Sequence, residues 1–236
     1  MKKILISGGN GNLAKSILKA NDTHNVIALC KDTLNVTNKA KLDSVLSELK
    51  PDIFIHAGAL TRPMVKHVVS PNDSIENNII GTSNVVLACL KYKIKLIYIS
   101  TDYVYPCTRG NYHELDALLP VNEYAWSKLG GECAVKLYKN SLILRMALCQ
   151  KPFPHDKALT NIKKSYLYMD EAASIILKLI DEKGIINVGG EPMSPYEFIR
   201  KTNPNIGKIS FEEVKDVNMG KDSSMNIDKL KTIIND

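Results

Sequence analysis

The fold is decided by residues 4–14, which read Ile4-Leu5-Ile6-Ser7-Gly8-Gly9-Asn10-Gly11-Asn12-Leu13-Ala14. An apolar run typical of a strand leads into a glycine-rich turn, and a helical pattern follows it. Gly8 permits a tight turn, Gly11 lets the main chain come close to a ligand, and the small Ala14 lets the helix pack on the strand. A helix N-terminus attracts phosphate. Because strand, turn and helix occur in the order this mechanism requires, the stretch favours a dinucleotide-binding turn over a plain loop.

The alternation of strand and helix patterns continues through the first 145 residues. The predicted strands are Lys3–Ser7, Val26–Cys30, Ile53–His56, Lys95–Ser100 and Leu142–Arg145. The predicted helices between them are Leu13–Ala20, Ala40–Lys50, Ser74–Tyr92 and Asn122–Lys139. Single helices between apolar strands are typical of βαβ units, whose right-handed crossovers build a parallel sheet covered on both faces. The pattern therefore predicts an α/β fold with a Rossmann-like doubly wound parallel sheet.

The texture of the sequence changes after about Met146. A Pro152-Phe153-Pro154 segment and a stretch rich in Lys and Asn precede shorter elements around residues 166–169, 172–180, 185–188 and 196–201. We expect residues 1–150 to form an NAD(P)-binding domain, to which a later strand near residues 185–188 is added. Residues 151–236 are expected to form a small C-terminal substrate-binding lobe over the carboxyl ends of the strands, where ligands of open α/β sheets bind.

Composition excludes several other classes of protein. The chain has 236 residues, 44% hydrophobic and 24% charged, which suits a folded globular protein rather than a disordered chain or a fibre. No apolar run approaches the roughly 18 residues of a spanning helix, and the run after Met1-Lys2-Lys3 is too short for a signal peptide, so we expect a cytoplasmic protein. The five cysteines are odd in number and widely spaced, and predict neither disulfides nor a metal site.

The charge balance points to a small anionic ligand. The chain carries 31 basic and 25 acidic side chains, a formal net charge of +6. The lysines are interleaved with acids and no basic stripe alternates with aromatic residues, so nucleic acid is not an expected partner. The mild excess of Lys suits phosphorylated metabolites, although a solvated lysine-rich surface explains any single Lys equally well.

Two further segments bear on the cofactor. The second predicted strand ends in Cys30-Lys31-Asp32, where an acid at the first position would accept from the ribose 2′-hydroxyl of NAD. With no carboxylate there and a cation at Lys31, the sequence favours NADP(H) and leaves NAD(H) possible. The third predicted strand ends in His56-Ala57-Gly58-Ala59, whose small side chains would let a cofactor lie against the backbone, although a tight packing loop is the alternative.

A Tyr-x-x-x-Lys pair, Tyr124 and Lys128, opens the helix after the fourth strand. Chance alone predicts about one such pair in a chain of this composition, so its position carries the argument. The preceding strand ends in Ser100-Thr101-Asp102, which brings a hydroxyl, a phenol and an amine to one edge of the sheet. There Lys128 would lower the pKa of the phenol and hold the nicotinamide ribose. Tyr124 would exchange a proton with a substrate oxygen, which Thr101 would orient.

Several segments together resemble the extended short-chain dehydrogenase/reductase superfamily and, within it, the dTDP-4-dehydrorhamnose reductase family. The segments are Gly8-x-x-Gly11-x-x-Ala14, 34–38, 51–59, Ile99-Ser100-Thr101-Asp102-Tyr103-Val104-Tyr105, 112–114, 120–132 and 222–230. The resemblance implies reduction of a 4-keto group on a nucleotide-linked 6-deoxyhexose, with Thr101, Tyr124 and Lys128 as catalytic residues.

The resemblance also implies two sets of binding residues. The cofactor would be bound by Gly8, Asn10, Gly11, Asn12, Leu13, Lys31, Asn35, Val36, Ala57, Gly58, Ala59, Ser100, Tyr124 and Lys128. The substrate would be bound by Thr61, Thr101, Asp102 and Tyr103. No metal is implied. A homodimer through residues 74–92 and 122–139 is possible by the same resemblance.

The chain departs from the superfamily's patterns at informative places. Tyr103 stands where the related dehydratases carry Glu, which argues against elimination chemistry. Met146-Ala147-Leu148-Cys149 replaces the family's Thr-Ser-Trp type of run, and the chain is shorter than the family in the substrate lobe. Two alternatives follow. One is a bifunctional 3,5-epimerase/4-reductase, in which Cys107 and His113 would act as acid and base. The other is a non-catalytic dinucleotide-binding regulatory subunit like methionine adenosyltransferase β.

Overall fold

The computed structural model describes residues 1–214 and 219–235. The strands are β1 Lys3–Ser7, β2 Asn25–Leu29, β3 Ile53–His56, β4 Lys95–Thr101, β5 Ser141–Cys149, β6 Lys157–Leu159, β7 Tyr166–Tyr168, β8 Gly184–Val188 and β9 Gly207–Ile209. The α-helices are α1 Asn12–Ala20, α2 Lys39–Leu49, α3 Lys66–Val69, α4 Pro71–Ser74, α5 Gly81–Tyr92, α6 Glu123–Lys136, α7 Met169–Lys178, α8 Pro195–Arg200 and α9 Asp228–Asn235.

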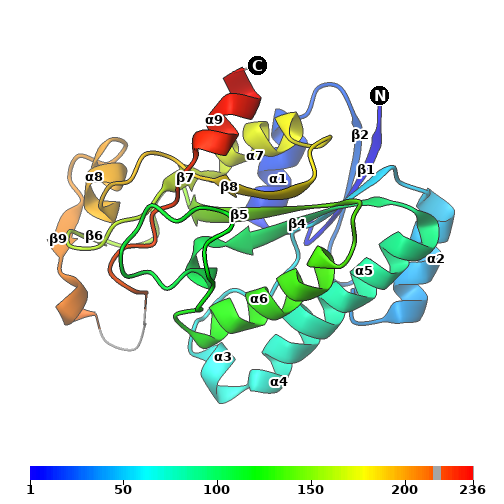
Figure 1. The fold of residues 1–236 in the computed structure, drawn as a ribbon, viewed down its shortest axis with the longest axis horizontal. Coiled ribbons are helices and arrows are strands. Elements are labelled where there is room, and N and C mark those ends of the chain that lie inside the picture. The colour runs from blue at the N-terminus through cyan, green and yellow to red at the C-terminus, as the bar shows by residue number, and fades with distance from the viewer. Residues whose placement is uncertain (215–218, 236) are drawn as a thin grey trace.

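A parallel sheet with strand order β2-β1-β3-β4-β5-β7 forms the centre of the described structure (Figure 1). β8 also pairs with β5, in the register Leu142↔Gly184 to Met146↔Val188. The chain moves outward from β1 to β2 and then crosses back to β3 on the other side of β1. This reversal is the switch point at which doubly wound sheets bind their ligands. The predicted fold class is therefore confirmed.

Two helical layers bury the faces of the sheet (Figure 1). On one face α1 and α7 pack on Ile4, Ile6 and Ile97, and Leu230 of α9 joins the same core. On the other face α2, α5 and α6 cover the alternate side chains, among them Leu5 and Phe54. The strands are apolar on both faces because neither face meets water.

The predicted helix Ser74–Tyr92 has a more varied form in the structure. It begins earlier, with α4 at Pro71, widens into a π-helix over Ile75–Ile80, and continues as α5. Within the wide turn, the buried Asn78 amide donates to Leu60 O at 2.9 Å and to Ser127 Oγ at 2.8 Å. These bonds tie the helix to the loop after β3 and to α6, a role that the apolar pattern of the helix does not encode.

The C-terminal part of the chain divides between two places. β7 and β8 extend the central sheet and α7 and α9 pack on it, whereas β6 and β9 form a separate parallel pair. This pair and α8 surround a small core that includes Ala158, Phe198 and Ile199. We refer to β6, α8 and β9 as the small lobe. Its β6–β9 pairing, between strands of three residues each, has no signature in the sequence.

Candidate active site

The glycine-rich turn lies at the switch point between β1 and β3. Gly8 has a φ of +79°, and a Cβ atom there would lie 2.8 Å from the Cα of Gly58. Gly11 N–H donates to Gly8 O at 2.8 Å and α1 begins directly afterwards. Glycine is required at position 8 by both its backbone conformation and the closeness of the loop after β3. The two loops thus form a backbone surface with almost no side chains.

The other predicted cofactor residues differ in how they face this surface. Asn10, Gly11 and Asn12 are exposed, and Ala57, Gly58 and Ala59 are half-buried beside them. The Leu13 side chain is buried in the core under α1, so only its backbone can face a cofactor. The turn, the helix N-terminus and the small residues together fit the pyrophosphate of a dinucleotide.

The residues at the end of β2 surround the position expected for the adenosine ribose. Lys31 is exposed, and its ammonium donates to Asn77 Oδ1 at 3.3 Å. Asn35 Oδ1 accepts from Thr37 N–H at 3.1 Å, and Val36 is half-buried. Lys31 is therefore the residue here that places a cation at the rim of the site.

Thr101 and Tyr124 are brought together by β4 and α6. Thr101 is the last residue of β4, and Asn122 caps α6 by accepting from Ala125 N–H at 2.9 Å, which places Tyr124 in the first turn. The Thr101 side chain lies close enough to the phenol to affect its pKa. Burial, followed by the Asp102 carboxylate, raises the pKa of Tyr124, while Thr101 and Lys164 oppose the rise. The phenol therefore holds its proton at neutral pH, the state needed to donate it.

Lys128 lies one turn further along α6 and is buried. Its ammonium lies 4.1 Å from the centroid of the Tyr98 ring. Burial lowers the pKa of Lys128 to about 7, although the carboxylate of Glu132 opposes this. The pKa of Tyr124 is raised, whereas we expected from the sequence that Lys128 would lower it. Burial of the phenol is the largest effect on this pKa. A buried amine needs polar partners, and at this position the ribose hydroxyls of a cofactor would provide them.

Ser100 and Glu132 belong to a buried network behind the site that the sequence did not reveal. The Ser100 hydroxyl donates to Glu132 Oε2 at 2.7 Å, so the side chain of this predicted cofactor residue is bonded within the protein. Glu132 Oε1 also receives Arg145 Nη2 at 2.5 Å, and Arg145 Nη1 donates to Tyr105 at 2.8 Å. The ion pair joins α6 to β5, and the Ser100 hydrogen bond joins α6 to β4. The signal available in the sequence was a charged residue at the end of a predicted strand.

The predicted substrate residues lie on two sides of the catalytic pair. Thr61 is exposed, on the loop after β3, whereas Asp102 is buried and Tyr103 is half-buried at the end of β4. The Asp102 carboxylate accepts from Thr101 at 3.0 Å and from Lys164 at 2.5 Å. Lys164 was not predicted, because a single lysine in a lysine-rich stretch has no pattern.

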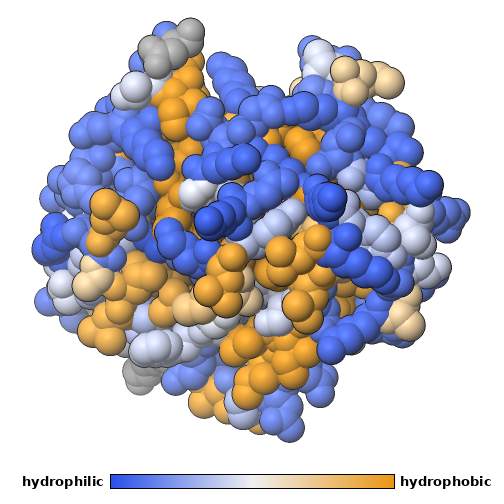
Figure 2. Space-filling model, turned by 45° about the vertical axis from the view of Figure 1, so that its right-hand side comes forward, coloured by the Kyte–Doolittle hydropathy of each residue, from blue (hydrophilic) through white to orange (hydrophobic). Residues whose placement is uncertain are grey.

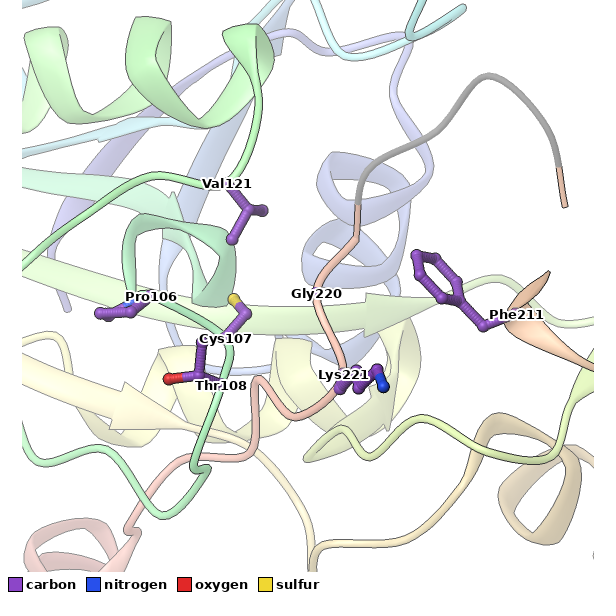
Figure 3. A pocket seen from close by; sticks show the side chains of 7 residues that line it. All are labelled: Pro106, Cys107, Thr108, Val121, Phe211, Gly220 and Lys221. Carbon is purple, nitrogen blue, oxygen red and sulfur yellow. The ribbon is translucent and has the colours of Figure 1, made fainter.

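A cavity of about 430 Å³ opens beside the catalytic edge of the sheet (Figure 3). It lies between the loop after β4 and the segment that leads to the C-terminus, and it is lined by Pro106, Cys107, Thr108, Val121, Phe211, Gly220 and Lys221. Burial raises the pKa of Cys107 to about 12, so this thiol is protonated. Cys107 is buried and His113 is exposed, and no hydrogen bond joins them in the described structure.

The sheet order, the glycine turn at the switch point and the Thr101, Tyr124 and Lys128 side chains define a Rossmann-type protein of the extended short-chain dehydrogenase/reductase class. Residues 1–152 match the family described as the RmlD substrate binding domain. The chain belongs to that family, as the sequence motifs predicted.

Individual relatives agree with this assignment. A dTDP-4-dehydrorhamnose reductase of Aggregatibacter actinomycetemcomitans is 26% identical over 227 residues, which cover 84% of this chain and 77% of that protein. The structure of a dTDP-4-dehydrorhamnose reductase from Bacillus anthracis in complex with NADP matches with a TM-score of 0.88 and 26% identity, over 98% of this chain and 92% of that one. The methionine adenosyltransferase 2 subunit beta of Pongo abelii is 27% identical over 143 residues, 57% of this chain and 42% of that protein.

Among the described residues, no helix is both long and apolar enough to cross a bilayer.

Proposed function

We propose that this protein is a cytoplasmic NAD(P)H-dependent reductase of a 4-keto group on a nucleotide-linked 6-deoxyhexose. The observation that carries the proposal is the meeting of the Thr101 hydroxyl and the Tyr124 phenol at the carboxyl edge of β4, beside the glycine turn of β1. A pure binding module has no need of a proton donor at that place. The reductases of this kind among the relatives and solved structures support the same substrate class.

The cofactor would supply a hydride to the carbonyl carbon of the substrate. The protein's own residues then have three tasks. Gly8, Gly58 and the start of α1 hold the pyrophosphate, and Lys128 binds the nicotinamide ribose. Tyr124 gives its phenolic proton to the substrate oxygen, so that one O–H bond breaks and another forms as the carbonyl becomes a hydroxyl. Thr101 orients that oxygen towards the phenol.

The small lobe and the cavity in Figure 3 are our candidates for recognition of the nucleotide part of the substrate. They combine an aromatic ring, Phe211, with an exposed cation, Lys221, which can bind a base and a phosphate respectively. This proposal assigns the small lobe within residues 151–236 to specificity, and the central sheet to the cofactor and the chemistry.

The proposal is tested by following the absorbance of NADPH with dTDP- and UDP-linked 4-keto-6-deoxyglucose. Turnover by the wild type, and its loss in Tyr124→Phe, are expected. No oxidation above the variant's with any such sugar rejects the reductase. Incorporation of solvent deuterium at C3 or C5 would identify the bifunctional alternative.

The similarity to methionine adenosyltransferase 2 subunit beta favours one second candidate, a non-catalytic regulatory subunit. This candidate predicts NADPH binding without turnover of any keto sugar, and co-purification with a larger partner enzyme. Binding measured by NADPH fluorescence, run beside the turnover assay, separates the two functions.

A homodimer through α5 and α6 is part of the proposal. Leu87, Leu90 and Trp126 are 58%, 49% and 53% exposed on these helices, although large apolar side chains are usually covered. Apolar side chains gather over the lower part of the face in Figure 2. Pairing of two such helical faces would bury them.

A further inference from the structure

Lys164 joins the C-terminal part of the chain to the catalytic edge of the sheet. It lies in the loop between β6 and β7, where its backbone makes two hydrogen bonds with Met193, at 3.0 and 3.1 Å. Its side chain reaches Asp102, 62 positions earlier in the chain, with Nζ 2.5 Å from Oδ2. The exposed fractions of the two side chains are 2% and 3%, so this ion pair is fully enclosed.

Both carboxylate oxygens of Asp102 accept hydrogen bonds from side chains. Asp102 Oδ2 accepts from Lys164 and also from the Ser223 hydroxyl, at 2.6 Å, and Lys164 lies 2.9 Å from the same hydroxyl. The ammonium is further enclosed by the ring of Tyr103, whose centroid is 3.9 Å away. With Oδ2 occupied in this way, Oδ1 is directed at Thr101, which donates its proton to it at 3.0 Å.

The Thr101 oxygen is then left to accept. It receives Tyr103 N–H at 3.3 Å, and the Thr101 side chain is close enough to the Tyr124 phenol to affect its pKa. The arrangement runs from Tyr124 through Thr101 to Asp102, and Lys164 holds its far end. A buried ion pair contributes little net stability compared with apolar side chains of the same size, so stability alone does not account for one placed beside a catalytic hydroxyl.

We propose that Lys164 is a positioning residue, which acts through Asp102 to fix the direction of the Thr101 hydroxyl and hence the position of the Tyr124 phenol beside it. The inference deepens the proposed function and rests on it for its kinetic test. Lys164 also balances the charge of Asp102 near the phenol, which becomes negative when it gives up its proton. Burial is the largest single effect and opposes the charge of Lys164, but Asp102, Tyr166 and Cys107 together outweigh it and raise the pKa of Lys164.

The kinetic test compares Lys164→Met with Lys163→Met, which changes the exposed neighbouring lysine and is expected to leave kcat unchanged. For Lys164→Met we expect kcat for the keto sugar to fall by at least about tenfold, with KM for NADPH within about twofold of the wild type. Lys164→Arg, which keeps the charge, should retain more activity than Lys164→Met. A Lys164→Met enzyme as fast as Lys163→Met overturns the proposal.

The double variant Asp102→Asn/Lys164→Met buries no unpaired charge, and it carries the comparison if Lys164→Met does not fold. Its kcat should be below that of the wild type, but its loss should be smaller than the product of the two single losses, because the residues act as one unit. A wild-type kcat in this folded double variant, or strictly multiplicative losses in a folded set, contradicts the proposal.

A second cycle needs no substrate and separates this inference from the proposed function. Urea unfolding is measured for Thr101→Val, Lys164→Met and their combination. The effects of the two substitutions on the unfolding equilibrium constant should be non-additive by more than about threefold, although Lys164 acts on Thr101 only through Asp102. Lys164→Gln replaces Lys164→Met if the latter does not fold. If the wild type reduces no keto sugar, the proposed function fails and this cycle alone decides. Additive changes then reject the positioning role.

Discussion

Gly8 and Gly58 lie so close that a Cβ atom on Gly8 would be 2.8 Å from the Cα of Gly58. This contact joins the loop after β1 to the loop after β3, and it leaves a smooth backbone surface at the switch point of the sheet. Both features of position 8, its positive φ and its lack of space, exclude any side chain. The contact therefore provides a test of the cofactor site that does not depend on the identity of the sugar.

We predict that Gly8→Ala abolishes NADPH binding and lowers the free energy of unfolding by at least about 2 kcal/mol, because the added methyl group meets backbone that cannot move away. Gly184→Ala is the matched control. Gly184 also has a positive φ, +88°, but nothing lies within 4 Å of its Cβ position. The control should lose about 1 kcal/mol and bind NADPH normally. Equal losses in the two variants, measured by urea unfolding and fluorescence titration, contradict the close-contact argument.

The preference for NADP(H) is expected to depend on Lys31. Lys31→Glu should lower kcat/KM for NADPH by about tenfold or more and change the value for NADH far less, since an acid beside the ribose repels a 2′-phosphate. Lys19→Glu makes the same charge change on the exposed surface of α1 and should leave the ratio of the two values unaltered. If Lys31→Glu leaves the ratio of kcat/KM for NADPH to that for NADH unchanged, another residue binds the 2′-phosphate.

Stability in acid should depend on His56, which is buried between Ser7 Oγ at 2.7 Å and Thr82 Oγ1 at 3.1 Å. Burial, with a smaller effect of Lys128, lowers the pKa of His56 to about 3. Below pH 6.5 the unfolded chain binds a proton there that the folded chain does not. The free energy of unfolding should therefore fall with decreasing pH between about 6.5 and 3, by up to about 1.4 kcal/mol per pH unit from this group.

His56→Gln isolates this contribution, because its amide does not titrate. Urea unfolding at several pH values should show the wild type losing stability more steeply than the variant as the pH falls. Parallel pH profiles for the two proteins would show that His56 does not resist protonation.

The assembly through α5 and α6 predicts a monomer when both exposed leucines of α5 are made acidic. Leu87→Asp/Leu90→Asp should sediment at half the mass of the wild type, because charge on an apolar contact prevents its burial. Leu18→Asp changes a leucine of α1 that is 42% exposed and should remain dimeric. A wild type that sediments as a monomer at micromolar concentrations excludes the dimer directly.

The fold was predictable from the sequence because each early strand is an apolar run between helical segments. Lys3–Ser7 was expected and found with the same bounds, and the parallel order followed from the βαβ pattern. The helix over residues 74–92 was expected in one regular form, since the partners of Asn78 in its π-helix lie in a distant loop and in α6. The β6–β9 pair was missed because strands of three residues, nearly 50 positions apart, show no period.

The candidate site was predictable where its residues follow strand ends, and unpredictable where its partners come from elsewhere. Thr101 and Tyr124 could be placed together because parallel strands end at one edge of the sheet. Lys164 could not, since its contact with Asp102 depends on how the last third of the chain folds back. Glu132 and Arg145 belong to the same category, because no local sequence pattern indicates that an acidic residue in a helix pairs with a basic residue in a strand.

The central claim is hydride transfer to the carbonyl carbon with proton donation by Tyr124. It is tested most directly with NADPH carrying deuterium at C4 of the nicotinamide and a dTDP-linked 4-keto-6-deoxyhexose, by NMR of the product. We predict one deuterium at the sugar's C4 for each cofactor oxidised, and a rate at least about 100-fold lower in Tyr124→Phe. Bound cofactor that is never oxidised, or a Tyr124→Phe enzyme as fast as the wild type, would contradict the account.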